Sequence, residues 1–177
     1  SAELMVRACC HTHKLPCVII RPSNNYGPYQ YPEKFIPLMI TNLLEDKPIP
    51  VYGSGKNVRD WLHIEDCCGG IDTIIRKGKP GEIYNLGGQS EHANIAVAKK
   101  VLKLLGKDES LISFVPDRPG HDFRYALDNS KIKELGWEPS VSFEKGLGNT
   151  VKWYRENEWW WKTLKNKMKR ENKGFWT

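Results

Sequence analysis

The sequence predicts an α/β fold on two observations. Segments with helical spacing of apolar residues alternate with short strand-like segments along the whole chain. One of those strands, residues 17–20, is wholly apolar, which is typical of a strand covered on both faces of a parallel sheet. The chain has 177 residues, of which 40% are apolar and 11% aromatic, so it can bury a core as one domain.

The predicted elements follow in order along the chain. We expect helices over residues 2–13, 33–45, 65–77, 95–105, 128–136 and 143–157, the fifth of them capped by Asp128 or Asn129. We expect short strands over residues 17–20, 50–52, 60–64, 83–86 and 113–115. Pro37 fits the first turn of its helix, and Gly106 is a typical residue just past a helix end. Because the strands are few and short for a self-sufficient sheet, we expect an amino-terminal part of the protein to be missing.

The positive charge is concentrated at one end of the chain. Residues 162–177 hold six Lys/Arg and one Glu, a net charge of +5, whereas the whole chain carries +6. We interpret this end as a solvated tail, so a nucleic-acid partner is not expected. No apolar run approaches the roughly 20 residues of a membrane span, and no export signal is present. The Trp159–Trp161 run suits docking of a carboxy-terminal helix onto the body.

The cysteines and histidines predict no disulfide and no metal site. The five cysteines include two adjacent pairs and no Cys-x-x-Cys spacing, so we expect reduced, mostly buried thiols of a cytosolic protein. His11 and His13 are two residues apart on a helix, so their side chains leave on different faces and make a poor metal pair.

Two adjacent amides follow the apolar strand. Asn24 and Asn25 lie where open α/β sheets bind ligands, beyond the carboxyl end of a strand. Such amides suit a phosphate, a sugar hydroxyl or a nicotinamide carboxamide. The alternative is a turn rich in Asn, Gly and Pro that is closed by its own side-chain hydrogen bonds.

Two further loops concentrate groups suited to an anion. Residues 50–61 combine Tyr52, a Gly-rich turn and Arg59, which suit stacking on a base and binding of a phosphate. Neither the P-loop nor the dinucleotide Gly motif is present. Residues 117–125 place Arg118 and His121 around a Pro-Gly turn. The alternatives are a surface hairpin and a solvated loop with ion pairs of its own.

Together the three loops predict a binding site for an anion joined to an aromatic ring, which a nucleoside diphosphate is. They offer cations, amides and an aromatic residue, but no nucleophile dyad and no metal set. The prediction requires that the loops after residues 20, 50 and 115 converge in space.

The motifs that carry a family resemblance are residues 23–28 (SNNYGP), 32–34 (PEK), 50–53 (PVYG), 59–61 (RDW), 84–88 (YNLGG) and 117–125 (DRPGHDFRY). In this order they resemble the carboxy-terminal half of the dTDP-glucose 4,6-dehydratases, which are extended short-chain dehydrogenases/reductases with a Rossmann-type fold. The resemblance extends from about Ser1 to about Tyr154. The last motif, with Glu33 and Lys34, favours this dehydratase over epimerases and decarboxylases of the same fold.

The resemblance implies a lyase that removes water from dTDP-glucose to give dTDP-4-keto-6-deoxyglucose. NAD takes a hydride from C4 of the sugar and returns it to C6, so it is regenerated in each turnover. Carried over by position, Asn25 contacts NAD. The substrate-binding residues implied are Asn24, Lys34, Phe35, Pro50, Val51, Tyr52, Arg59, Asn94, Asp117, Arg118, Pro119, Gly120 and His121.

The resemblance also implies a division of the chain. Residues 1–21 are expected to be a remnant of the NAD-binding Rossmann domain, 22–157 the nucleotide-sugar-binding region, and 158–177 a basic, Trp-rich tail. The family's Gly-rich NAD motif, Tyr-x-x-x-Lys pair and acid/base residues precede the position of Ser1. We therefore name no catalytic residue, and we expect the chain alone to be inactive and to bind NAD poorly.

Two alternatives stay open at this point. One is a UDP-sugar epimerase or decarboxylase of the same fold, and the other is a non-catalytic nucleotide-sugar-binding module. The resemblance further implies a cytoplasmic homodimer when full length, acting in deoxysugar biosynthesis, with no nucleic-acid or membrane partner.

Overall fold

The computed structural model describes residues 1–170 of the chain. Its helices are α1 (Ala2–His13), α2 (Phe35–Leu44), α3 (Ile64–Lys77), α4 (Asn94–Leu105), the 3-10 helix η1 (Glu109–Leu111), α5 (Ser130–Lys133), α6 (Phe143–Glu156) and α7 (Glu158–Arg170). Its strands are β1 (Ile19–Pro22), β2 (Asn24–Tyr26), β3 (Ile49–Tyr52), β4 (Val58–His63), β5 (Ile83–Leu86), β6 (Glu91–Ala93), β7 (Ile112–Val115) and β8 (Arg124–Tyr125). The predicted α/β class is confirmed.

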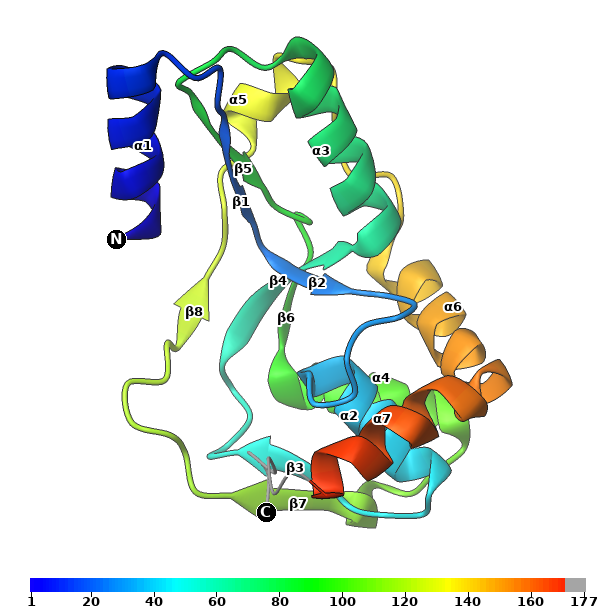
Figure 1. Cartoon of the computed structure of the whole chain (residues 1–177). Coiled ribbons are helices and arrows are strands. Elements are labelled where there is room, and N and C mark those ends of the chain that lie inside the picture. Colours follow the sequence, from blue (N-terminus) through cyan, green and yellow to red (C-terminus); the bar gives the residue numbers. More distant parts are fainter. Residues whose placement is uncertain (171–177) are drawn as a thin grey trace.

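The strands form three small sheets, as Figure 1 shows. β1 pairs in parallel with β5, and β3 pairs in parallel with β7. The third sheet is built around β4, which pairs in parallel with β2 and β8 and antiparallel with β6. β4 therefore receives three chain segments that are far apart in sequence, and it forms the framework of the candidate site.

Two hydrophobic clusters lie on either side of β4. The larger combines α2, α4, α6 and α7 with β3, and Trp61 belongs to it. The smaller combines β5, α3 and α5, and Leu62 belongs to it. Successive residues of a strand point to opposite faces, so the adjacent Trp61 and Leu62 contribute to different clusters. β4 thus holds the two halves of the fold together.

The strand predicted at residues 17–20 is wrong in its position and its burial. β1 spans Ile19–Pro22, because its pairing with β5 begins at Ile19 opposite Ile83. Ile19 and Ile20 are only half-buried, and Arg21 and Pro22 are exposed. Within the described chain β5 is its single strand neighbour. Ile20 packs against the smaller cluster and is only half-buried, so the faces of β1 are partly covered rather than fully buried.

Most predicted helices and strands lie where expected, but three short strands were not anticipated. β2, β6 and β8 are two or three residues long and rich in polar residues, so they carry no hydrophobic period. The N-cap of α5 is Asn129, one of the two predicted residues, but its side chain makes no capping hydrogen bond. The carboxylate of Asp128, just before it, accepts a hydrogen bond from the Ser130 backbone N–H at 2.9 Å. That helix ends at Lys133, earlier than predicted.

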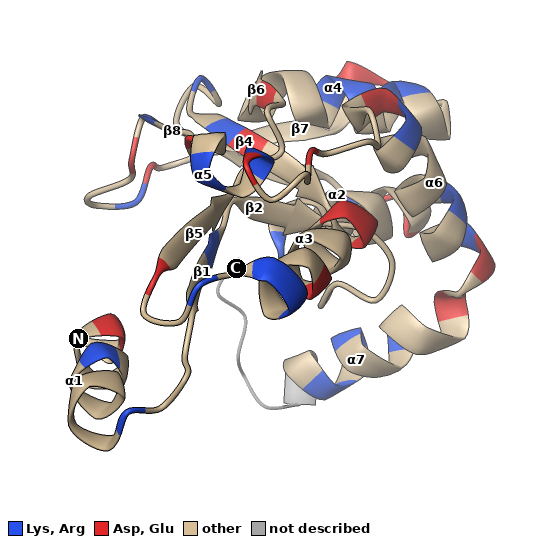
Figure 2. Cartoon of the chain, turned by 90° about the horizontal axis from the view of Figure 1, so that it is seen from above, with Lys and Arg blue, Asp and Glu red and all other residues tan. Residues whose placement is uncertain are grey.

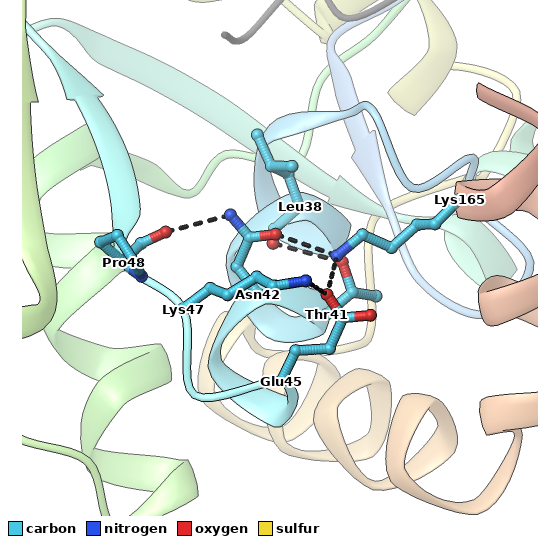
Figure 3. A network of polar contacts seen from close by, with 7 residues as sticks. All are labelled: Leu38, Thr41, Asn42, Glu45, Lys47, Pro48 and Lys165. Atoms are coloured by element: carbon cyan, nitrogen blue, oxygen red, sulfur yellow. Dashed lines mark hydrogen bonds and ion pairs between the residues drawn. The ribbon is translucent and has the colours of Figure 1, made fainter. Parts of the chain in front are cut away.

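The interpretation of residues 162–177 as a solvated tail is wrong for residues 162–170, which belong to helix α7 (Glu158–Arg170). Trp161 is fully buried, and its indole N–H donates to the carbonyl of Tyr154 at 2.8 Å. Lys165 reaches from α7 to Asn42 Oδ1 on α2 at 2.9 Å and to Glu45, the C-cap of α2, at 3.0 Å (Figure 3). The predicted docking of a Trp-bearing helix onto the body is confirmed, and residues 171–177 lie outside the described residues.

All five cysteines are free, as expected, but only Cys67 is buried. The expectation of mostly buried thiols is therefore wrong, because Cys9 and Cys10 lie on α1, a helix with no buried residue. In residues 1–170 no helix combines the length and hydrophobicity needed for a membrane crossing. The same residues contain no cluster of three potential metal ligands among His, Cys, Asp and Glu.

Candidate functional site

The three polar loops converge on one cavity of about 440 Å³, as the prediction required. Its wall includes Asn24 from β2, Arg59 from β4 and Arg118 from the loop between β7 and β8. The full lining is Asn24, Glu33, Lys34, Phe35, Tyr52, Arg59, Trp61, Asn94, Arg118 and His121. The cavity therefore gathers side chains from six separate segments around β4.

Successive side chains of β4 alternate between lining the cavity and bonding to the neighbouring backbone. Arg59 and Trp61, two residues apart, both line the cavity. Asp60 between them is buried, and its carboxylate accepts the backbone N–H groups of Gly88 at 2.9 Å and Ser90 at 2.8 Å. Gly88 is required there, because a Cβ on it would lie 1.8 Å from the Trp61 carbonyl oxygen. This contact fixes β4 against the turn that follows β5.

Arg59 is a buried cation without a carboxylate partner. Its side chain is 5% exposed, and its guanidinium donates to the carbonyls of Val58 and Asp122, both at 2.7 Å. Among residues 1–170 no carboxylate lies within 4.0 Å of it. A buried charge is costly unless a counter-charge compensates it. The surface hairpin with an ion-paired Arg59 is therefore wrong, and the residue is suited to an anionic ligand.

Asn24 reaches the cavity with a fixed amide. Its Oδ1 accepts a hydrogen bond from the hydroxyl of Tyr125. Within the described chain the amide Nδ2 has no acceptor, so a hydrogen-bond donor remains available at the cavity wall. The ring of Tyr125 also lies under the guanidinium of Arg59, whose central carbon is 4.7 Å from the ring centroid.

The loop carrying Arg118 is held by a hydrogen bond between two of its own side chains. His121 Nδ1 lies 2.6 Å from Asp117 Oδ1, and this hydrogen bond holds the pKa of the Asp117 carboxyl below its ordinary value. The ring of His121 packs edge-on against Tyr52, with centroids 5.9 Å apart. Asp117 supports the loop from outside the cavity, and Arg118 is left as an exposed cation at its wall.

The start of α2 supplies both charge and an aromatic surface. Lys34 lines the cavity and pairs with Glu33 at 3.1 Å. Phe35 stacks on Trp61 with an interplanar angle of 18° and centroids 6.1 Å apart. Counted over the lining, three Lys/Arg side chains face one carboxylate, beside three aromatic residues. This composition matches the two parts of a nucleotide, since the cations suit phosphate and the rings suit a base.

The structure brings together eight of the 13 predicted substrate-binding residues and leaves five outside the cavity lining. The five are Pro50, Val51, Asp117, Pro119 and Gly120. Val51 is wholly buried in the core, because β3 alternates and directs Tyr52 rather than Val51 to the cavity. Sequence reasoning missed Glu33 and Trp61 as lining residues, although Trp61 could have been found from its spacing of two from Arg59.

Asn25, predicted to contact a cofactor, lies outside this cavity. Its amide Nδ2 donates to the Ser23 carbonyl at 3.2 Å, and its backbone carbonyl accepts from Gln30 at 2.7 Å. The side-chain Oδ1 is buried and has no hydrogen-bond partner among the described residues. A buried acceptor left unpaired costs about 1–3 kcal/mol, so this atom is suited to a donor from outside the described chain.

Comparison with known proteins places the chain in a family. The family model described as GDP-mannose 4,6 dehydratase matches residues 1–150. The chain belongs to this family. Among curated relatives, the dTDP-glucose 4,6-dehydratase of Streptomyces niveus is 48% identical over 167 residues, covering 94% of this chain and 50% of the relative. That of Neisseria meningitidis is 48% identical over 178 residues, with the same two coverages of 94% and 50%.

Several solved structures are similar to the chain. The dTDP-glucose 4,6-dehydratase of Bacillus anthracis in complex with NAD has a TM-score of 0.88 and 52% identity, over 93% of this chain and 52% of that one. A UDP-glucose 4-epimerase from Thermotoga maritima with UDP-glucose has a TM-score of 0.83 and 28% identity, over 88% of this chain and 51% of that one. The fold is thus the Rossmann-like α/β fold of extended short-chain dehydrogenases/reductases, and the chain spans about half the length of these relatives.

Proposed function

We propose that the chain is the carboxy-terminal, substrate-binding part of a dTDP-glucose 4,6-dehydratase, and that the cavity around β4 binds the nucleoside diphosphate of the sugar substrate. The observation that carries this proposal is the buried, unpaired guanidinium of Arg59 in a cavity that also presents Lys34 and Arg118. Two phosphates bring at least two negative charges to three cations. The names of the relatives and the order of the motifs support the dehydratase over other members of the fold.

Each part of the proposed ligand has candidate partners. Arg59 and Arg118 neutralise the diphosphate, and Asn24 donates its amide N–H to a phosphate oxygen. Tyr52, Phe35 and Trp61 form the aromatic wall that suits a pyrimidine ring. In this proposal residues 22–157 bind the substrate, residues 1–21 belong to the NAD-binding domain, and α7 braces the whole from outside.

NAD is the cofactor that this proposal implies, and Asn25 is the residue of this chain that fits it. The buried Oδ1 of Asn25 is an acceptor without a partner among residues 1–170, which suits an N–H donor such as a carboxamide. NAD, when bound, accepts a hydride from the sugar and returns it. The contribution of this chain is to hold the sugar diphosphate so that the hexose is presented to the cofactor.

The proposal also includes a cytoplasmic homodimer for the full-length protein. It is supported by α1, on which Leu4 is 70% exposed and Met5 69% exposed, an apolar surface suited to a protein partner. Free cysteines on the same helix are in keeping with a reducing compartment.

Calorimetric titration with dTDP and with UDP tests the binding proposal. We expect dTDP to bind more tightly than UDP, and a preference for UDP would contradict the thymidine assignment. Arg118→Ala should weaken dTDP binding by about 1.5–3 kcal/mol, which is about 10–150-fold, because a charged hydrogen bond is lost. Arg76→Ala is the matched control, since Arg76 is exposed on α3 and pairs with Asp72 there. Equal affinities of the two variants would place Arg118 outside the site.

A further inference from the structure

Tyr125 contacts two residues of the cavity wall without lining the cavity itself. Its hydroxyl donates to Asn24 Oδ1, and its ring lies 4.7 Å below the guanidinium carbon of Arg59. Both contacts belong to residues that the proposed function assigns to the diphosphate. One side chain outside the cavity therefore touches two of its anion-binding groups.

The sheet explains how this residue meets both partners. β2 and β8 pair with successive stretches of β4, with Asn24 opposite Trp61 and Tyr125 opposite Arg59. The strand β8 is only two residues long, and both of its residues are exposed. Its neighbour Arg124 pairs with Glu91 at 2.6 Å, which anchors β8 against β6. The position of Tyr125 is thus set by β4 and by the ion pair beside it.

The two contacts have different chemical consequences. An asparagine amide presents an acceptor and a donor, and either can face a ligand. Because Oδ1 is occupied by the Tyr125 hydroxyl, Nδ2 is the atom left for the cavity, and a donor is what a phosphate oxygen needs. The aromatic ring acts on Arg59, whose planar guanidinium is held between the ring and the two backbone carbonyls it donates to.

We infer that Tyr125 is a positioning residue for the anion site: its hydroxyl fixes the amide of Asn24 with the donor toward the ligand, and its ring fixes the plane of Arg59. This inference rests on the proposed function, since it gives the anion as a nucleoside diphosphate. It separates the two roles within one side chain, so Tyr125→Phe removes the first role and Tyr125→Ala removes both.

Titration with dTDP of the whole chain tests the inference. We expect Tyr125→Phe to weaken binding about 3–10-fold, the equivalent of one hydrogen bond, and Tyr125→Ala to weaken it further. If the hydroxyl acts through Asn24, then adding Tyr125→Phe to Asn24→Ala should cause no additional loss of affinity. Phe123→Ala is the control in the same loop, because Phe123 is 68% exposed, and it should bind like the wild type.

Two outcomes overturn the inference while leaving the proposed function intact. One is a Tyr125→Phe variant that binds dTDP as tightly as the wild type. The other is a Tyr125→Phe change that weakens dTDP binding as much in the Asn24→Ala background as it does in the wild type. If the wild type binds neither dTDP nor UDP, the proposed function fails instead. In that case NMR of the side-chain NH₂ group of Asn24, recorded without ligand, still tests the positioning role. A change of its chemical shifts in Tyr125→Phe supports that role, and unchanged resonances refute it.

Discussion

The first and last helices of the described chain have similar lengths and opposite attachments. α1 has 12 residues, none of them buried, and its side chains reach the body through an exposed ion pair between Glu3 and Arg21. α7 has 13 residues and places Trp161 wholly within the larger core cluster. In Figure 1 and Figure 2 alike, α1 stands at the edge of the molecule, across β1 and β5 from α3.

The comparison shows that helix composition did not decide which helix packs. α1 carries Leu4, Met5 and Val6 in succession, whereas residues 158–170 hold five Lys/Arg. Blue segments along α7 in Figure 2 mark basic residues of this helix. A single large aromatic with a buried hydrogen bond fixes the more charged helix, because it meets a surface on α2 and α6 that fits it. The apolar residues of α1 meet no such surface among the described residues.

The strongest way to break the comparison is to remove the anchor of α7. Trp161→Ala should lower the free energy of unfolding by about 3–5 kcal/mol, because it leaves a large cavity and an unpaired Tyr154 carbonyl. A urea titration followed by circular dichroism measures the change. Trp159→Ala is the matched control, since Trp159 is 68% exposed, and its effect should stay within about 0.5 kcal/mol. Similar losses in both variants would show that α7 is not anchored by Trp161.

The same contrast explains which parts of the fold the sequence predicts. Long amphipathic helices such as α4 and α6 can be predicted from the helical spacing of their apolar residues. The strand predicted at residues 83–86 has the observed bounds of β5. The strands β2, β6 and β8 were missed because their pairing with β4 depends on partners distant in the chain. For α7, local charge pointed to a tail, and a tertiary contact overrode it.

Residue type alone was enough to predict the anion-binding residues of the candidate site, but not the direction in which each side chain points. Arg59 and Arg118 were selected because guanidinium groups in loops after strands suit phosphates, and both line the cavity. Whether a residue of β3 faces the cavity or the core depends on strand alternation, which places Val51 in the core. The contacts of Tyr125 depend on the register between β4 and β8, which no local pattern reveals.

A smaller effect comes from the polar contact between α7 and α2. Lys165→Met keeps the aliphatic stem beside Trp161 and removes the bonds to Asn42 and Glu45, so we expect a loss of about 1 kcal/mol. Lys162→Met is the control on the same helix, because its pair with Glu158 is exposed and contributes less than about 0.5 kcal/mol. Urea titrations at matched ionic strength compare the two. Equal losses would mean that the half-buried pair adds no more than an exposed one.

Low pH should distinguish the carboxylate that binds α7 from the carboxylate on α1 by how much each stabilises the fold. Burial acts to raise the pKa of Glu45, but hydrogen bonds and charge from Lys47 and Lys165 outweigh it, so the pKa lies below the ordinary 4.5. A carboxyl with a lowered pKa stabilises the fold above its unfolded value, and this stabilisation is lost as pH falls through the folded value. The difference in unfolding free energy between wild type and Glu45→Gln should therefore be full above pH 4.5 and decline below it.

Glu3 is the control for that titration. Its hydrogen bond with Arg21 also lowers its pKa, so the sign of the pH dependence is the same. Its side chain is exposed, however, and solvent and salt screen the pair. Glu3→Gln should therefore change the unfolding free energy less than Glu45→Gln at every pH. In high salt the effect of Glu3→Gln on the unfolding free energy should vanish. A larger effect for Glu3 would reverse the order of attachment inferred for the two helices.

The smallest expected effect belongs to the apolar face of α1. Leu4→Ser should change the free energy of unfolding by no more than about 0.5 kcal/mol, because Leu4 is 70% exposed and loses little contact. Titrations at two protein concentrations make the result informative. A loss that grows with protein concentration would show that a second copy covers this face in solution, since association stabilises the folded state by mass action. A loss of several kcal/mol at all concentrations would instead mean that α1 packs onto its own chain, and the contrast with α7 would no longer hold.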